Sequence, residues 1–154
     1  MSWKPYHLDH HAMLLVQSAI KRDPKSLNQA YKMRTTCAYG MERFWGEHLR
    51  LLQSNSQSDQ YKGEFVADTW SDFWSLIHDI SPDLAERLPK KIEIRVANEA
   101  INQRNERINQ VVVNSAKLFW ELDIADQRNC LSILSALCDA IVWWTQRLKP
   151  SNLD

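Results

Sequence analysis

Residues 64–80 read EFVADTWSDFWSLIHDI and carry the clearest helical pattern in the chain. The apolar side chains recur every three or four positions, which places them on one face of a helix. These apolar residues are Val66, Trp70, Phe73, Ile77 and Ile80. The opposite face is acidic and carries Glu64, Asp68, Asp72 and Asp79. The stretch therefore predicts a surface helix whose apolar stripe packs against a core.

The same spacing continues on both sides of this stretch, and prolines end several of the segments. It predicts further helices over residues 7–22, 27–53, 82–88, 90–122 and 124–148. The polar stretch 54–62 predicts a loop. Residues 92–96 alternate like a β-strand, but the chain offers no second strand to pair with them. We therefore predict an all-α protein, a single domain over residues 1–154, with about five main helices and one long helix near 90–122.

The composition excludes several classes of protein. The chain has 154 residues with 19 basic and 19 acidic side chains, so it lacks the surplus positive charge of a whole-surface nucleic-acid binder. Three glycines are too few for a phosphate-binding loop or a dinucleotide fingerprint, and we expect no cofactor. The neutrality is uneven, because residues 1–53 have four more basic than acidic residues. A local basic groove along the predicted helices 27–53 and 90–122 is therefore compatible with the composition.

The cysteine count and the apolar stretches predict the compartment. Three cysteines, Cys37, Cys130 and Cys138, do not read as a disulfide framework, and we expect buried thiols. The first residues, MSWKPYHLDHH, lack the apolar core of a signal peptide. The longest apolar stretch, residues 136–144, is too short to span a membrane. We expect a cytoplasmic protein that does not associate with membranes.

The predicted helix over 90–122 carries an unusual ladder of amides at spacings of 4, 3 and 4. The ladder consists of Asn98, Asn102, Asn105 and Asn109. Asn is a mediocre helix former, so such a run needs a reason: it either serves a binding role or forms a merely polar surface. Amides can cross-link helices at an interface or contact a nucleic-acid backbone. The candidate partner-binding or nucleic-acid-binding set is completed by the basic residues Arg34, Arg95, Arg104 and Arg107.

Arg43 and His48 stand in the stretch RFWGEH, which fits the pattern Arg-x4-His. This six-residue pattern resembles the motif of HEPN-type ribonucleases, which are small all-helical domains. The resemblance implies that Arg43 would stabilise phosphate charge. It also implies that His48 would activate a ribose 2′-hydroxyl or protonate the leaving oxygen. A metal-independent endoribonuclease is therefore the alternative function.

Three histidines near the start of the chain form a weak candidate metal half-site. His7, His10 and His11 fall at helical positions i, i+3 and i+4, so their imidazoles would share one face. A structural metal site needs about four ligands, and His48 and His78 lack the spacing to complete this one. The alternative is a solvated, histidine-rich terminus, and we predict no metal.

The chain contains seven tryptophans, more than core packing alone explains. Trp is enriched at the energetic centres of protein interfaces. With no catalytic set beyond the Arg43–His48 pattern, we predict a small non-catalytic interaction subunit of a larger complex. Its partner would be another protein or a second copy, and it could also contact a nucleic-acid backbone. The small all-helical subunits of CRISPR effector complexes are a precedent in size and architecture alone.

Overall fold

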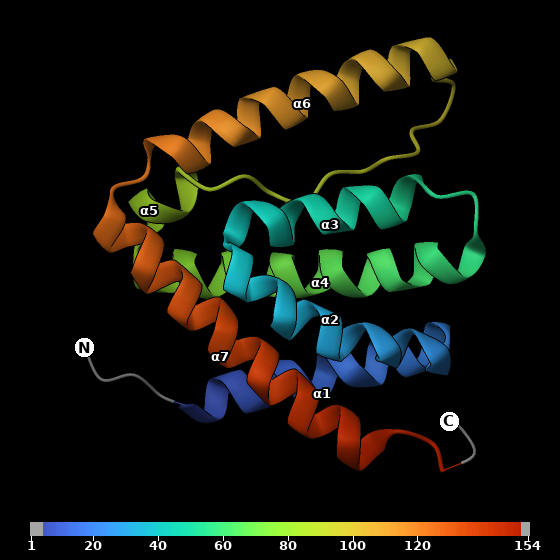
Figure 1. Cartoon of the computed structure of the whole chain (residues 1–154), viewed down its shortest axis with the longest axis vertical. Coiled ribbons are helices and arrows are strands. Elements are labelled where there is room, and N and C mark those ends of the chain that lie inside the picture. The colour runs from blue at the N-terminus through green and yellow to red at the C-terminus, as the bar shows by residue number, and fades with distance from the viewer. Residues whose placement is uncertain (1–4, 152–154) are drawn as a thin grey trace.

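The computed structural model describes residues 5–151, and this part of the chain is helical without any β-strand (Figure 1). It contains seven α-helices and two short 3-10 turns. The α-helices are α1 (Pro5–Arg22), α2 (Gln29–Thr36), α3 (Met41–Gln53), α4 (Gln57–Ile80), α5 (Pro82–Glu86), α6 (Ile101–Glu121) and α7 (Ile124–Leu148). The 3-10 turns are η1 (Pro24–Asn28) and η2 (Cys37–Tyr39). The predicted all-α class is confirmed, with more helices than the five predicted.

An antiparallel hairpin of α3 and α4 lies at the centre of the arrangement (Figure 1). On one side of this hairpin, α1 packs against α4, and α7 crosses both α1 and α2. On the other side, α6 lies along α3 (Figure 1). Most of the helices therefore pack closely against one another, whereas α6 forms an outer layer that packs mainly against α3.

The core between these helices is rich in aromatic side chains. Trp70, predicted to face the core, is fully buried. Its ring centroid lies 4.9 Å from that of Phe73 and 6.2 Å from that of Phe44. From α6, Phe119 reaches the same cluster with its centroid 6.0 Å from Trp70. Each such side chain contributes about 2–3 kcal/mol through burial, so Phe119 is a main anchor of α6.

Two helices follow the sequence prediction closely because local capping residues define them. α7 has the predicted bounds, and the side chain of Asp123 accepts a hydrogen bond from the backbone N–H of Asp126 at 2.8 Å. α4 ends where predicted but begins at Gln57, because Ser56 caps it by accepting from the N–H of Asp59. The predicted loop over 54–62 is therefore only residues 54–56.

The predicted continuous helix over 27–53 is wrong. It is divided into η1, α2, η2 and α3, and the sharpest break falls at Gly40. Gly40 has a φ of 99°, a conformation that residues with a Cβ rarely adopt. The apolar stripe continues across the break, which is why periodicity alone predicted one helix.

The predicted long helix near 90–122 is also wrong in its first third. α6 begins at Ile101, and residues 87–100 form a non-helical segment that we call the α5–α6 connection. It contains Asn98, which has a φ of 64° in a turn, a conformation that Asn tolerates better than most residues. The strand-like alternation at residues 92–96 is matched by alternating burial, since Ile94 is buried while Glu93 and Arg95 are exposed.

Candidate binding site between α3 and α6

Three tryptophans hold the beginning of the α5–α6 connection by its backbone. The indole N–H of Trp74 donates to the carbonyl of Leu88 at 3.4 Å. The indole of Trp70 donates to the next carbonyl, Pro89, at 2.7 Å. The indole of Trp45 donates to the following carbonyl, Lys90, at 3.0 Å. Three consecutive carbonyls therefore find partners in α3 and α4, and these bonds replace the ones a helix would supply.

His48 extends this anchoring by one further residue. The backbone N–H of Ile92 donates to its Nε2 at 3.1 Å, so that nitrogen carries no proton. The Nδ1–H in turn donates to the carbonyl of Trp45. The ring is fully buried, and this burial, with the nearby Lys91 cation, lowers the pKa of His48 to about 4. His48 is therefore a neutral structural residue with both ring nitrogens in use.

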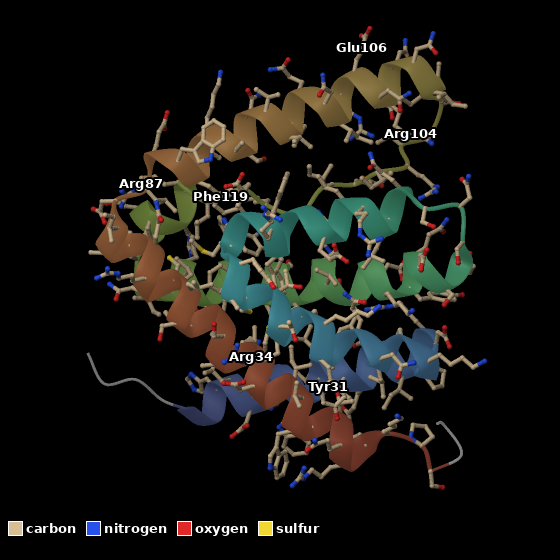
Figure 2. The ribbon with its side chains drawn as sticks, in the orientation of Figure 1. Tyr31, Arg34, Arg87, Arg104, Glu106 and Phe119 are labelled. Carbon is tan, nitrogen blue, oxygen red and sulfur yellow. The ribbon has the colours of Figure 1, made fainter. Side chains whose placement is uncertain are left out.

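Arg107 on α6 clamps the far end of the connection. Its guanidinium donates to the carbonyls of Glu93 and Ile94, each at 2.8 Å. It also forms a two-pronged pair with the Glu99 carboxylate, at 2.7 and 2.9 Å. The hydrogen bond from Arg107 lowers the pKa of Glu99. Arg104 lies 3.9 Å from the same carboxylate, and Figure 2 shows it on the side of α6 that faces the connection.

The other basic residues of the predicted binding set are also engaged within the fold. Arg95 donates to the carbonyls of Leu52 and Ser54, at 2.6 and 3.4 Å, where it caps the C-terminal end of α3. Arg34 pairs with Asp139 of α7 at 2.5 Å (Figure 2). The four predicted arginines are thus dispersed over internal contacts instead of forming one basic groove.

The amide ladder lies partly where it was predicted. Asn102, Asn105 and Asn109 are exposed on α6, within about 60° of one another around the helix axis by helical geometry. Asn98 precedes the helix in the turn of the connection, so it does not continue the ladder. The exposed amides border the same side of α6 as Val112 and the small Ala116.

A groove of about 480 Å³ separates α3 from α6. Its floor is mostly apolar and includes Leu49, Val112, Ala116 and Phe119. Gly46 opens it from the α3 side, because a Cβ at this position would meet no atom within 4 Å. Charged side chains line its rim: Glu42, Arg43, Glu47 and Arg50. The groove is therefore suited to apolar side chains flanked by charges.

A second hollow of about 220 Å³ adjoins this groove and shares Glu42 and Phe119 with it. It is bordered by an exposed aromatic edge, in which Tyr39 is 71% and Trp120 is 70% exposed. The indole of Trp120 donates to Glu42 at 3.3 Å, which fixes the ring beside the hollow. Ile124, at the start of α7, is 66% exposed. We call the groove together with Tyr39, Trp120 and Ile124 the α3–α6 surface.

Nothing in the geometry favours Arg43 and His48 as a catalytic pair. Arg43 is exposed on the rim of the groove, whereas His48 is buried against the connection. Five positions along a helix turn the two side chains about 140° apart. A ring with both nitrogens bonded to backbone has none left to transfer a proton to RNA in this conformation.

The N-terminal histidines have no metal-site geometry. His7 and His10 are exposed, and His11 lies 3.1 Å from the Asp72 carboxylate. Among residues 5–151, no group of three or more His, Cys, Asp or Glu side chains could hold a metal ion. The acidic face of α4 is partly neutralised instead, since Asp68 contacts both Arg22 and Lys91.

Sequence reasoning missed most of the α3–α6 surface. Nothing in the sequence distinguishes Gly46, Val112 and Ala116 from other helical residues. The position of Tyr39 depends on the break at Gly40, which the sequence did not predict. The only signal was the surplus of tryptophan. The tryptophans turn out to serve two different roles. Three of them donate hydrogen bonds to the α5–α6 connection, whereas Trp120 is exposed on the α3–α6 surface.

Comparisons of the chain with family models, with curated proteins and with solved structures find no match. In the part of the chain that the structure describes, no helix is both long enough and apolar enough to cross a membrane.

Proposed function

We propose that the protein is a non-catalytic interaction subunit that binds a partner protein through the α3–α6 surface. The observation that carries this proposal is the concentration of exposed apolar side chains on one helix and its flank. Ten large apolar residues are exposed in the described part of the chain. Five of them lie on α6 or at the start of α7: Ile101, Val112, Val113, Trp120 and Ile124. Of these, Val112 lines the groove and Trp120 the adjoining hollow, so exposed apolar area gathers at the α3–α6 surface, as it does at sites that bind partners.

The chemistry of the groove indicates the kind of segment it receives. Its apolar floor suits aliphatic or aromatic side chains, as in the binding of an amphipathic helix. On the rim, Arg50 is already paired with Glu47 at 2.5 Å. Among the described residues none forms an ion pair with Arg43, which leaves this cation available to a carboxylate. The partner is therefore an apolar segment carrying an acidic residue.

Nucleic acid is a weaker partner on the same observations. Arg34, Arg95 and Arg107 would each have to leave an internal contact before binding phosphate. Phosphate contacts need several unengaged cations along one face. A basic groove along α2–α3 and α6 stays the alternative, and its mark would be binding that weakens steeply with salt.

The test compares variants that alter the groove without touching the core. Gly46→Leu places a side chain in the groove, while Gly46→Ala is the matched control that adds only a Cβ. Trp120→Ala removes the exposed anchor, and Trp143→Ala is its control on another exposed tryptophan. A partner captured with the wild type is purified, and its Kd is measured for each variant by titration.

We expect Gly46→Leu and Trp120→Ala to raise this Kd about tenfold or more, and both controls to leave it unchanged. Arg43→Gln should raise it less, with a reduced dependence on salt. Equal affinity in all variants would contradict the proposal. Capture of RNA in place of a protein, lost at high salt, would support the nucleic-acid alternative, and self-association lost in the same two variants would identify a second copy as the partner.

A further inference from the structure

Two cysteines that are far apart in the sequence meet in the core. The Sγ of Cys37, in η2, lies 3.7 Å from the Sγ of Cys138, in α7, across 101 positions of sequence. Both side chains are buried, and both are free thiols. The remaining cysteine, Cys130, is also buried, and it lies in α7 eight residues before Cys138. The fold therefore selects one pair out of three cysteines.

The surroundings of this pair make its two members chemically different. Hydrogen bonds from Cys138 and Ser135, with the nearby Arg34 guanidinium, lower the pKa of Cys37. The bond to Cys37 and burial raise the pKa of Cys138. Burial raises the pKa of Cys130 to about 11. Cys37 is thus the thiol that most readily becomes a nucleophilic thiolate, and Cys138 lies beside it as a protonated neighbour.

We propose that Cys37 and Cys138 form a peroxide-sensitive dithiol that closes to an intramolecular disulfide. In the first step, the Cys37 thiolate attacks one oxygen of hydrogen peroxide and the O–O bond breaks. The departing hydroxide takes up a proton to give water, and Cys37 becomes a sulfenic acid. In the second step, the Cys138 sulfur attacks the Cys37 sulfur and the S–O bond breaks. The hydroxyl leaves as a second water with the Cys138 proton, so two thiols are oxidised and one peroxide is reduced.

The geometry makes this closure feasible with small movements. The two sulfur atoms must approach from 3.7 Å to bonding distance, about 2.05 Å. Cys37 lies in a short 3-10 turn, which is a weaker element than an α-helix and can adjust locally. The Arg34–Asp139 pair joins the same two segments, because Arg34 precedes Cys37 by three positions and Asp139 follows Cys138. This ion pair keeps the two elements adjacent while the bond forms.

The disulfide would fix the segment that carries part of the α3–α6 surface. η2 ends at Tyr39, and Gly40, with its positive φ, joins η2 to α3. A bond from Cys37 to α7 would therefore limit motion of Tyr39 at the edge of the smaller hollow. The closure itself does not depend on the proposed function, and its test needs no partner.

The experiment treats the folded full-length protein with hydrogen peroxide, then denatures it and alkylates the remaining thiols. Before alkylation, the intact mass should be lower by two hydrogens than that of the untreated protein. After alkylation, we expect one modified cysteine and a peptide pair linking Cys37 to Cys138. Cys130→Ser is the matched control and should form the same link. In Cys138→Ser, Cys37 should gain oxygen instead. The Tm of the oxidised protein should rise by roughly 5–10 °C, because the bond closes a long loop.

A second reagent tests the pair without oxidation. Phenylarsine oxide condenses with two neighbouring thiols and releases one water, so the wild type should gain one equivalent that survives excess monothiol. Cys130→Ser should bind it equally, and Cys37→Ser should not retain it. Three results would overturn the proposal: a wild type whose thiols survive peroxide while it is folded, a link that involves Cys130, or a Cys37 that is oxidised to sulfinic acid with Cys138 present.

Discussion

The backbone N–H of Ile92 donates a hydrogen bond to Nε2 of His48 at 3.1 Å. This bond joins α3 to the α5–α6 connection, where the backbone N–H of Ile92 has no hydrogen bond within a helix. Trp45, one turn earlier on α3, holds the carbonyl of Lys90. One face of α3 therefore anchors the connection, while the neighbouring face borders the groove. The position of α6, and with it the groove, depends on these contacts.

Because the fold keeps His48 neutral, the protein should lose stability in mildly acidic solution. The folded-state pKa is about 4, below the ordinary value of 6.5, so between these values the unfolded chain binds a proton that the folded chain does not. Stability should therefore be fully present above pH 6.5 and decline as the pH falls towards 4. The loss from this one group amounts to about 3 kcal/mol.

This pH dependence can be isolated with His48→Gln, which keeps an acceptor for Ile92 but does not titrate. Urea unfolding of both proteins between pH 7 and pH 4 gives the difference in free energy of unfolding at each pH. The wild type should lose about 3 kcal/mol relative to the variant across this window. Carboxylates titrate in both proteins and cancel. Parallel curves would show that His48 does not stay neutral in the fold.

Trp70→Phe should be markedly destabilising although the ring remains aromatic. The change removes the N–H that donates to Pro89 at 2.7 Å and leaves a void in a fully buried site. We expect a loss of about 2–3 kcal/mol, combining an unsatisfied carbonyl with the cavity. Guanidinium unfolding measures it. Trp143→Phe, at a ring that is 47% exposed, is the control and should change stability by less than about 1 kcal/mol. Equal effects in the two variants would mean that the indole bond is unimportant.

Arg107→Gln should release the end of the connection without unfolding the bundle. Its guanidinium holds two carbonyls and the Glu99 carboxylate, and a shorter amide cannot reach all three. Hydrogen–deuterium exchange should therefore quicken in residues 93–107 and stay unchanged in α1 and α7. Arg128→Gln, at an exposed residue of α7, should leave the pattern of exchange as in the wild type. Faster exchange throughout the chain would indicate a global loss of stability instead.

The sequence predicted the bounds of those helices that begin and end at capping residues or prolines close by in the sequence. α7 has its predicted bounds because Asp123 caps one end and Pro150 follows the other. The connection could not be predicted, because its partners Trp45, His48 and Trp70 lie on two other helices, far away in the sequence. Apolar residues recur at helical spacing both in α7 and in the α5–α6 connection, so this pattern could not distinguish them. The connection is non-helical because side chains of α3 and α4 form hydrogen bonds with its backbone.

The candidate site shows the same division. Exposure of Asn102, Asn105 and Asn109 followed from their spacing along a helix, which is a local property. The roles of Arg95 and Arg107 did not, because their acceptors are carbonyls that only the fold brings near. A basic residue in a sequence shows a charge but not whether the fold already uses it. In this fold Arg34, Arg95 and Arg107 therefore hold internal contacts, which the charge of the sequence could not show.

Two glycines in helices should respond oppositely to the same substitution. A Cβ on Gly46, in α3, would meet no atom within 4 Å, so Gly46→Ala should stabilise the protein by about 0.5–1 kcal/mol through helix propensity. A Cβ on Gly63, in α4, would lie 2.9 Å from the backbone nitrogen of Leu52, where α4 approaches α3. Gly63→Ala should therefore destabilise by more than about 1 kcal/mol, since backbone has to move. Urea unfolding of both variants decides the matter. A stabilising Gly63→Ala would mean that the α3–α4 hairpin is more loosely packed than this contact requires.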